Sequence, residues 1–398
     1  MKYLVVIANG LTDRPIAEKE NKTPLQLADT PNLDRMVQEG CSGSVQTIPE
    51  NCKAGNEISY LSLLGYDPEK HDIGPAYFDA LAIGLNLKEG EIPLCCNFIT
   101  LQASHNDMVM KDYTADHLSN EESINYLNAL QTQISDFGVT FYPGVGPHNI
   151  MVMNSKPFTI RLTSPNELIG EGIRKFMPVD AEFKDLIYII NQAQIILHNH
   201  PVNKKRKLES LDSANSIWLW GNGKNGTLPS FQKKYGKSGS LISASLLFQG
   251  MAKSAEMKVV KVEGASGFAE TNFENKVKAA IHELESQEIV YLNVAGIEDI
   301  SLKGNIDDKI ITIEDIDSKV IGPLLKETFS NKEVKMMVVV NHMNSAVDVK
   351  YGKDRVPFVM SGKNDTNLVS NFDENLLNVG KNHFKSGSDL MSMFFDLN

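Results

Sequence analysis

Short apolar runs recur along the chain, and polar or glycine residues follow most of them. They lie at 4–8, 258–262, 289–294, 336–340 and 356–360. The first of them ends at Asn9-Gly10, a pair that favours a turn. Runs of this length are typical of strands that are buried on both faces of a sheet. We therefore predict a strand at each of these positions.

Helical patterns lie between several of these predicted strands. We predict helices at 25–38, 58–64, 275–285 and 306–329. Thr23-Pro24 supplies a cap and a first-turn proline for the first of them. The third has an apolar face formed by Val277, Ile281 and Leu284. Alternating strands and helices predict an α/β fold whose mostly parallel sheet is flanked by helices.

The middle of the chain has a different pattern, with shorter and more mixed segments. It includes the pairs Pro143-Gly144 and Gly146-Pro147. A chain of 398 residues is long for one compact core and favours two domains. We predict a core formed by 1–92 and 213–398, and an α+β domain at 93–212 that is inserted into it as a substrate-binding cap.

Composition and charge narrow the function classes. Hydrophobic residues make up 42% of the chain, and the formal net charge is −11. Such a surface repels nucleic acid and anionic membranes, so we expect neither as a partner. We see no signal peptide and no membrane span, and we expect a cytoplasmic protein. The basic run at 204–207 is expected to be a solvated loop, with phosphate binding as the alternative.

Cysteine spacing gives no sign of a metal site or of a disulfide framework. The four cysteines are Cys41, Cys52, Cys95 and Cys96. They show no C-x-x-C spacing, and no histidine pattern accompanies them. Reduced thiols are therefore the simplest interpretation.

Polar residues follow three of the predicted strands. Asn9 follows the first, 295–299 follows the strand at 289–294, and Asn341-His342 follows the strand at 336–340. Open α/β sheets bind ligands at the carboxyl ends of their strands, so these residues indicate a site. Asn-Gly and Asn-His are also ordinary turn residues, and the pattern alone leaves both interpretations open.

Longer motifs add to this picture. In chain order they are 9–15 (NGLTDRP), 22–25 (KTPL), 30–34 (TPNLD), 61–68 (LSLLGYDP), 112–117 (DYTADH), 200–203 (HPVN) with Arg206, 217–221 (IWLWG), 264–267 (GASG) and 271–272 (TN). On these motifs the chain resembles the archaeal-type, 2,3-bisphosphoglycerate-independent phosphoglycerate mutases of the alkaline phosphatase superfamily. The matches keep their order and span nearly the whole chain.

The resemblance implies an alkaline-phosphatase-like core with an inserted domain. It implies a serine that takes the phosphoryl group of 3-phosphoglycerate and returns it to the neighbouring oxygen, assisted by two divalent metals, manganese or magnesium. The residues that it implies for substrate binding are Asp112, Tyr113, His117, His148, His200, Asn203, Arg206 and Trp220. Arg206 suits a bidentate phosphate contact.

The chain departs from the family at the reaction centre. Asn9 stands where the family has aspartate, and Asn56 stands where it has the nucleophilic serine. Asn341-His342 replaces an Asp-His pair, and Tyr351 replaces a further histidine. The Asp-x-x-x-His motif should fall within 296–304, which contains no histidine. The arginine expected near Gly74-Pro75-Ala76 is missing as well.

These departures predict a site without metal. Two dications carry four positive charges, whereas amides supply no formal charge and are poor manganese ligands. An amide also cannot accept a phosphoryl group. We therefore expect no intact catalytic residue and no metal at the vestigial positions Asn9, Asn56, Asn341, His342 and Tyr351. The leading hypothesis is a binding or regulatory pseudoenzyme that takes phosphoglycerate or another small phosphorylated or carboxylate ligand, as a homo- or hetero-oligomer.

Two alternatives remain open at this stage. The first is an active phosphoglycerate mutase, or a homoserine-kinase-like phosphotransferase, with a relocated metal site. That site would need carboxylates from Asp13, Glu57, Glu298, Asp299 and Asp348. The second is a fold-stabilising or oligomerisation component without a ligand pocket. A shared position of those five carboxylates would favour the first alternative.

Overall fold

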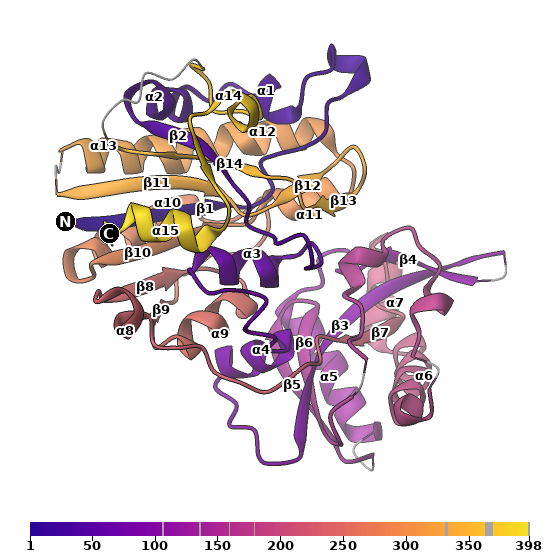
Figure 1. Ribbon diagram of the computed structural model, residues 1–398. Coiled ribbons are helices and arrows are strands. Elements are labelled where there is room, and N and C mark those ends of the chain that lie inside the picture. The colour runs from indigo at the N-terminus through magenta and orange to yellow at the C-terminus, as the bar shows by residue number, and fades with distance from the viewer. Residues whose placement is uncertain are drawn as a thin grey trace. The chain divides into compact units, whose positions relative to one another are not determined.

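The computed structural model describes residues 1–105, 107–134, 137–158, 160–178, 180–330, 333–362 and 369–396. The chain forms two compact units (Figure 1). The core unit comprises Met1–His71 and Thr227–Asn398, and the inserted unit comprises Asp72–Gly226. We had expected the insertion to span 93–212. The observed insertion is longer because α4 (Pro75–Ala82) and β7 (Ser216–Trp220) contact β3 (Glu91–Ser104), the long strand of the inserted unit.

The core unit is built on one eight-stranded sheet. Its strand order is β15 (Asn382–Phe384), β2 (Cys41–Val45), β14 (Val356–Met360), β11 (Val334–Val340), β1 (Lys2–Ala8), β10 (Ile289–Val294), β8 (Gly239–Ile242) and β9 (Lys258–Val260). Only β14 runs antiparallel to its neighbours β11 and β2. All other neighbours in the sheet are parallel. The mostly parallel sheet is therefore confirmed.

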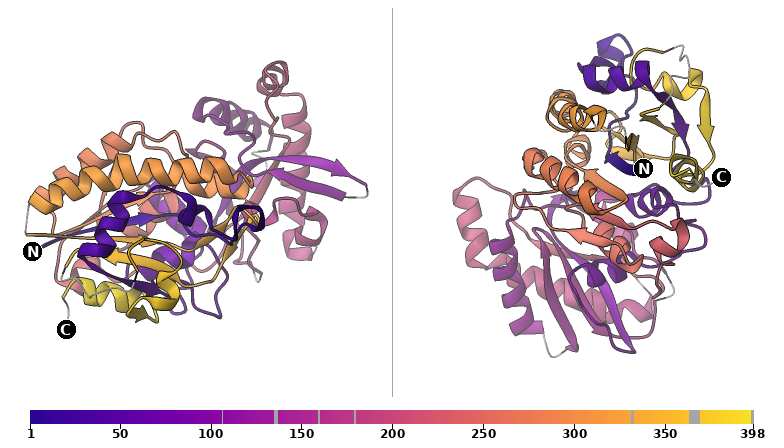
Figure 2. Two further views of the ribbon diagram at one scale, coloured as in Figure 1. Left: turned by 90° about the horizontal axis from the view of Figure 1, so that it is seen from above. Right: turned by 90° about the vertical axis from the view of Figure 1, so that its left-hand side faces the viewer.

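Helices lie on both faces of this sheet (Figure 2). One group consists of α2 (Pro31–Glu39), α10 (Phe273–Ser286), α12 (Ile306–Ile316) and α13 (Gly322–Ser330). The other consists of α3 (Asn56–Leu63), α9 (Leu246–Ser254) and α15 (Gly387–Phe394). Shorter elements are α1 (Pro24–Leu27), α8 (Phe231–Tyr235), α11 (Ile297–Leu302), α14 (Leu376–Val379) and the hairpin of β12 (Met343–Ser345) with β13 (Lys350–Gly352). Burial on both faces explains the continuous apolar sequence of β1, β10 and β11.

Two predicted helices are interrupted in the structure. The helix expected at 25–38 is split into α1 and α2, because Pro31 disfavours helical backbone at Thr30. The helix expected at 306–329 contains a π-helical segment at Asp317–Ile321. There the buried Asp317 carboxylate accepts hydrogen bonds from the backbone N–H groups of Asn32 and Leu33. A long-range contact therefore caps α2, and the local sequence pattern does not reveal it.

The inserted unit has an antiparallel sheet of five strands. The long strand β3 pairs with β4 (Asp107–Asp112), β6 (His148–Asn154) and β7, and β5 (Val139–Val145) pairs with β6. Its helices are α4, α5 (Asn120–Ile134), α6 (Lys184–His198) and α7 (Pro201–Leu208). Apolar residues of α5, α6 and the sheet share one core cluster. The expected α+β character of the insertion agrees with these elements.

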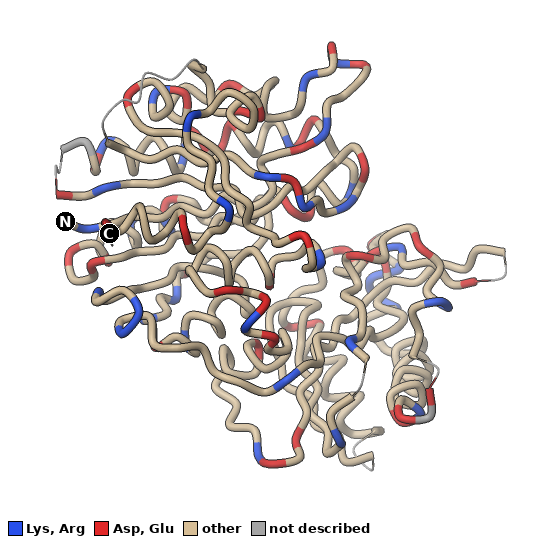
Figure 3. Tube along the Cα trace, in the orientation of Figure 1, with Lys and Arg blue, Asp and Glu red and all other residues tan. Residues whose placement is uncertain are grey.

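Charged residues of both signs alternate along both units (Figure 3). The basic run at 204–207, which we expected in a loop, lies in helix α7. Its Arg206 side chain is only 2% exposed and does not face solvent. Among the described residues, no helix is both long and apolar enough to cross a membrane.

A buried ion pair fixes the loop that follows β1. The Lys309 ammonium on α12 donates hydrogen bonds to Asp13 Oδ2 at 2.9 Å, to the Asn344 carbonyl at 2.6 Å and to the Thr12 carbonyl at 3.3 Å. Both charged side chains have an exposed fraction of 0%. Burial lowers the pKa of Lys309, and the Asp13 carboxylate opposes that shift. The ion pair ties the loop after β1 to the hairpin that follows β11.

Replacing Lys309 with methionine should leave the Asp13 carboxylate buried without its counter-ion. We expect Lys309→Met to lower the free energy of unfolding by about 3–5 kcal/mol, measured by urea denaturation. The control is Lys19→Met, which breaks the exposed Lys19–Asp307 pair and should cost less than about 1 kcal/mol. Equal effects of the two substitutions would contradict the structural role of Lys309. Adding Asp13→Asn to Lys309→Met should recover part of the loss.

The same loop contacts a carboxyl group with a raised pKa. Glu374 accepts hydrogen bonds from the Asp13 backbone N–H at 3.1 Å and from the Thr23 hydroxyl at 2.6 Å. Burial raises the pKa of Glu374 from its usual 4.5 to about 7. The folded protein therefore retains a proton that the unfolded chain releases above about pH 4.5. Stability contributed by this proton is lost as the pH rises from about 4.5 to about 7.

Glutamine at position 374 preserves the shape and cannot ionise. We expect Glu374→Gln to match the parent protein in thermal stability at pH 4 and to exceed it at pH 8, because only the parent must bury a carboxylate. The measurement is a series of melting curves across this range. Glu39→Gln, which changes an exposed carboxylate beside Arg35, should leave the pH profile unaltered. Parallel profiles for Glu374→Gln and the parent would refute the raised pKa.

Candidate functional site

The central strands of the core unit bring the predicted site residues together. β1 lies between β10 and β11, and Ala8 is in register with both Val294 and Val340. All three strands are parallel, so their carboxyl ends meet at one edge of the sheet. Asn9, the loop after β10 and the Asn341-His342 pair therefore start from adjacent points. The N-terminal residue of α3, Asn56, joins them.

Three groups form a continuous series of hydrogen bonds, which we call the amide chain: Asn341, Asn56 and Glu298. The Gly10 backbone N–H donates to Asn341 Oδ1 at 3.0 Å. Asn341 Nδ2 donates to Asn56 Oδ1 at 2.8 Å. Asn56 Nδ2 lies 2.9 and 2.8 Å from the two carboxylate oxygens of Glu298. A backbone donor at one end and a carboxylate at the other fix the orientation of both amides.

Two contacts of Tyr351 complete this series, a hydrogen bond and a ring contact. The Tyr351 hydroxyl on β13 donates to Glu298 Oε1. The Tyr351 ring also meets His342 edge-on, with ring centroids 4.7 Å apart and planes at 65°. Tyr351 therefore anchors the carboxylate of α11 and covers the imidazole.

Asn9 belongs to a second, linked network. Asn293 Nδ2 donates to Asn9 Oδ1 at 2.8 Å, and Asn9 Nδ2 donates to the Tyr60 hydroxyl oxygen at 2.6 Å. The Ser243 hydroxyl in turn donates to Asn293 Oδ1 at 2.9 Å. Asn9 is only 1% exposed, and burial raises the pKa of Tyr60. Both polar groups of the Asn9 amide are thus satisfied by neutral side chains.

His342 is the one residue at the vestigial positions that matches the family. Its Nδ1 lies 3.0 Å from the Met343 carbonyl, and its Nε2 lies 3.2 Å from Asn56 Oδ1. A carbonyl oxygen can only accept, so Nδ1 donates to Met343, and Nε2 donates to Asn56 Oδ1 only when the imidazole carries a second proton. Burial lowers the pKa of His342, and the Glu298 carboxylate opposes that shift.

These residues do not fit a pair of divalent ions. The oxygens of Asn9, Asn56 and Asn341 already accept hydrogen bonds from protein donors. Glu298 is the only carboxylate in the two networks, so a single negative charge would face four positive ones. Manganese and magnesium favour carboxylate and water oxygens over amides. What the arrangement provides is a hydrogen-bonded lining of neutral amides with one carboxylate, Glu298, at the edge of the sheet.

Glu298 belongs to this site, but the sequence analysis named it only as a carboxylate of the relocated metal site and not among the vestigial positions. The spacing of the family motif Asp-x-x-x-His, counted from Glu298, puts the apolar and buried Leu302 at the histidine position. That spacing could have found Glu298 from the sequence. At this spacing the position expected for the histidine holds a side chain that cannot bind metal.

The relocated carboxylate site of the alternative hypothesis is not assembled. Asp13 pairs with Lys309, Asp299 lies 3.1 Å from Lys303, and Asp348 lies 3.7 Å from Arg14. Among the described residues, no three of the five candidate carboxylates, which also include Glu57 and Glu298, come within metal-binding distance of one another.

The substrate residues predicted from the motifs all lie in the inserted unit. Asp112, Tyr113 and His117 belong to one loop, in which Asp112 accepts hydrogen bonds from the Thr114 and Asp116 backbone N–H groups at 2.7 Å. Ala115, Asp116 and His117 all have left-handed backbone, with φ of 47°, 54° and 53°. Strained backbone of this kind persists only where its surroundings fix it.

Arg206 is what fixes that loop. Its guanidinium donates to the Ala115 and Asp116 carbonyls at 2.6 and 3.0 Å, to the Asp212 carbonyl at 2.8 Å and to Glu122 at 2.8 Å. These contacts use most of its donors inside the protein. The expected bidentate phosphate contact is therefore not prepared in this structure, and the observed role of Arg206 is to hold the loop.

The other predicted substrate residues fall into two groups. Asn203 is buried and bonds to the Tyr126 hydroxyl and to two backbone carbonyls, and His200 caps α7 by accepting from the Val202 N–H at 3.3 Å. Burial lowers the pKa of His200. His148 and Trp220 instead converge on Asn97, at 3.0 and 2.9 Å. Substrate contact by any of these residues stays a prediction.

Comparison with known proteins identifies the family. A family model described as 2,3-bisphosphoglycerate-independent phosphoglycerate mutase matches residues 37–203. A Geobacter sulfurreducens protein described as a probable 2,3-bisphosphoglycerate-independent phosphoglycerate mutase is 34% identical over 398 residues, which cover 100% of both chains. The chain belongs to this phosphoglycerate mutase family. A phosphoglycerate mutase from Methanosarcina mazei is 33% identical over 397 residues, 99% of each chain.

Solved structures agree with this assignment. A cofactor-independent phosphoglycerate mutase from Thermoplasma acidophilum is 25% identical, covers 100% of both chains and has a TM-score of 0.57. A Pyrococcus horikoshii protein shares the fold, with a TM-score of 0.77 at 24% identity over 100% of this chain and 97% of its own. The fold and the family predicted from the sequence motifs are confirmed.

The amide chain makes a direct prediction about Glu298. In Glu298→Gln, a neutral amide would replace the carboxylate that accepts from both Asn56 Nδ2 and the Tyr351 hydroxyl, so these charge-assisted hydrogen bonds would weaken. We expect the free energy of unfolding to fall by about 1–3 kcal/mol in chemical denaturation. Glu274→Gln, at an exposed Glu274–Lys278 pair, is the matched control and should change it little. If Glu298→Gln leaves the free energy of unfolding unchanged, the amide chain does not contribute measurably to stability.

Proposed function

We propose that this phosphoglycerate mutase family member is catalytically inactive and acts as a binding or regulatory protein. The observation that carries the proposal is the state of Asn56, which stands at the nucleophile's position. Its Oδ1 accepts from Asn341, and its Nδ2 donates to Glu298. The residue has no hydroxyl to phosphorylate, and both polar groups of its amide already have partners.

The charge of the site supports the same proposal. Phosphoryl transfer depends on positive charge that neutralises the phosphoryl oxygens in the transition state. In the family two metals supply that charge, and the residues present here do not fit them. The nearest charged side chain in the amide chain is Glu298, which would repel a phosphoryl group.

The ligand that we propose is a small phosphorylated or carboxylate molecule of the phosphoglycerate class. The related proteins are described as phosphoglycerate mutases, and the motifs of the inserted unit resemble theirs. His117 is the candidate contact, since its side chain is partly exposed, whereas both ring nitrogens of His148 already contact Asn97 and Asp79. Arg206 would act on such a ligand only indirectly, through the loop that it holds.

We expect no conversion of 3-phosphoglycerate to 2-phosphoglycerate by this protein with added manganese, and no phosphorylated side chain after incubation. The assay couples 2-phosphoglycerate to enolase, with the Thermoplasma acidophilum phosphoglycerate mutase as the positive control. Turnover that copurifies with the intact chain would overturn the proposal. Isothermal titration with 3-phosphoglycerate then separates a binding protein, which gives a saturable heat, from a component without a ligand pocket.

A variant that restores the family residues tests the cause. It combines Asn9→Asp, Asn56→Ser, Glu298→Asp, Leu302→His, Asn341→Asp and Tyr351→His. We expect this variant to retain manganese after dialysis, measured by elemental analysis, whereas the parent protein should not retain it at the sheet edge. Equal manganese content in both proteins would argue against charge loss as the reason for inactivity.

A further inference from the structure

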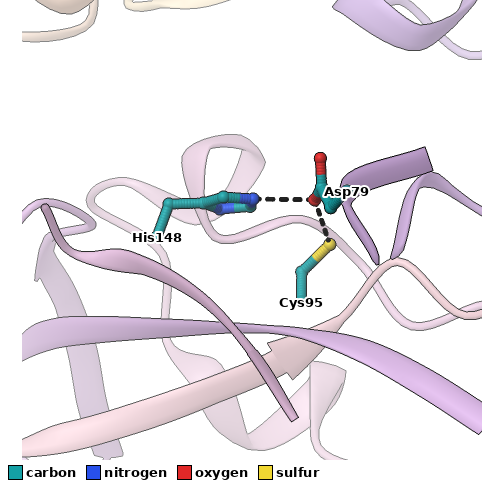
Figure 4. A group of neighbouring side chains, drawn as sticks. All are labelled: Asp79, Cys95 and His148. Atoms are coloured by element: carbon teal, nitrogen blue, oxygen red, sulfur yellow. Dashed lines mark hydrogen bonds and ion pairs between the residues drawn. The ribbon is translucent and has the colours of Figure 1, made fainter. Parts of the chain in front are cut away.

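A second group of polar side chains lies in the inserted unit, on α4, β3 and β6. It consists of Asp79, Cys95 and His148, which we call the thiol cluster (Figure 4). Asp79 Oδ2 lies 3.1 Å from Cys95 Sγ and 2.8 Å from His148 Nε2. Asp79 and Cys95 are 1% and 0% exposed, whereas the His148 side chain is 26% exposed. The cluster is thus buried on one side and reachable through the imidazole.

The orientation of His148 follows from its neighbours. The Trp220 indole N–H is only a donor and contacts Asn97 Oδ1 at 2.9 Å, which identifies that atom as the amide oxygen. His148 Nδ1 contacts the same oxygen at 3.0 Å and must therefore donate a proton to it. Nε2 is then the nitrogen that faces the Asp79 carboxylate. Histidines that bind metal are commonly fixed in this way, by a hydrogen bond from the other ring nitrogen.

Strand pairing holds the cluster in place. Asn97 is in register with His148 across β3 and β6, and Cys95 is in register with Trp220 across β3 and β7. Gly221, at a φ of 74°, lies over the thiol, where an added Cβ would come within 2.6 Å of Cys95 Sγ. Cys95 and His148 therefore lie on paired strands of the sheet, and Asp79 reaches them from helix α4.

One atom of the cluster is left without a hydrogen bond. Asp79 Oδ1 is buried and has no hydrogen-bond partner among the described residues, while Oδ2 of the same carboxylate has two close neighbours. Leaving a buried carboxylate oxygen unsatisfied is unfavourable. The described protein groups therefore satisfy only one of the two oxygens of the Asp79 carboxylate.

We propose that the thiol cluster binds a divalent transition-metal ion of the zinc class through Cys95 Sγ, His148 Nε2 and the Asp79 carboxylate. One atom from each residue lies within 4.8 Å of the others, which is close enough for a shared ion. Thiolate and imidazole ligands select zinc over magnesium, calcium or manganese. Binding displaces the thiol proton and the proton between His148 and Asp79. The thiolate and the carboxylate then balance the two positive charges.

This inference does not rest on the proposed function. Its three ligands belong to the inserted unit, and none of them belongs to the vestigial metal positions of the core unit. It also gives His148 a role other than substrate contact. Among the described residues, this is the only group of three or more histidine, cysteine or acidic side chains close enough to share an ion.

The test uses the full-length, reduced protein after removal of metal with a chelator. Cobalt(II) is titrated in and followed by absorbance, and zinc is then added as a competitor. We expect one equivalent of cobalt to produce a thiolate-to-cobalt charge-transfer band together with the visible bands of a four-coordinate site, and zinc to abolish both. Absence of a stoichiometric band in the parent protein would refute the site.

Two substitutions and a control identify the ligands. Cys95→Ser should abolish the charge-transfer band and weaken zinc binding by at least about tenfold, and His148→Gln should weaken binding similarly. Cys96→Ser is the matched control, since this neighbouring thiol is equally buried but points to the opposite face of β3. Far-ultraviolet circular dichroism checks that each variant is folded. A band that survives in Cys95→Ser, or disappears in Cys96→Ser alone, would overturn the assignment. If Cys95→Ser does not fold, unaltered binding by the folded His148→Gln would do the same.

Discussion

The core of the site depends on the direction of one series of hydrogen bonds, from the Gly10 backbone N–H to the Glu298 carboxylate. Each amide in the series accepts on one side and donates on the other. Because the first donor is backbone and the last acceptor is a carboxylate, neither Asn341 nor Asn56 can turn over without placing like groups together. The series therefore works as a unit, and a change at one position constrains the next.

This coupling gives a physical reason to expect that residues at positions 56 and 341 change together. An aspartate at position 341 would still accept from Gly10, but it would set a second oxygen against Asn56 Oδ1, the atom that now accepts a hydrogen bond from Asn341 Nδ2. In a site without metal, neutral amides satisfy the buried groups, whereas uncompensated carboxylates would repel one another. This lining is a consistent structure in its own right.

Sequence reasoning succeeded where the signal is local or is carried by a motif. The apolar runs located β1, β10, β11 and β14, because strands buried on both faces have little freedom in composition. Sequence reasoning failed where a contact between residues far apart in the chain determines the local structure. Asp317 lies in a π-helical interruption and accepts hydrogen bonds from the N-terminus of α2. The buried Arg206 side chain donates to carbonyls roughly ninety positions away in the chain. Neither partner can be identified from spacing along the chain.

The two polar clusters show that charge balance, more than the number of polar atoms, decides which can hold a cation. The networks at the sheet edge contain one carboxylate, Glu298, among side chains that carry neutral amide, hydroxyl or imidazole groups, which include Asn9, Asn56, Asn341, Tyr351 and His342. The thiol cluster has only three side chains, yet in the metal-bound form two of them, the Cys95 thiolate and the Asp79 carboxylate, are anionic. A dication buried at the first would stay largely uncompensated, whereas at the second it would form a neutral unit. The same physical criterion that argues against the family's metals in the core unit therefore argues for a different metal in the inserted one.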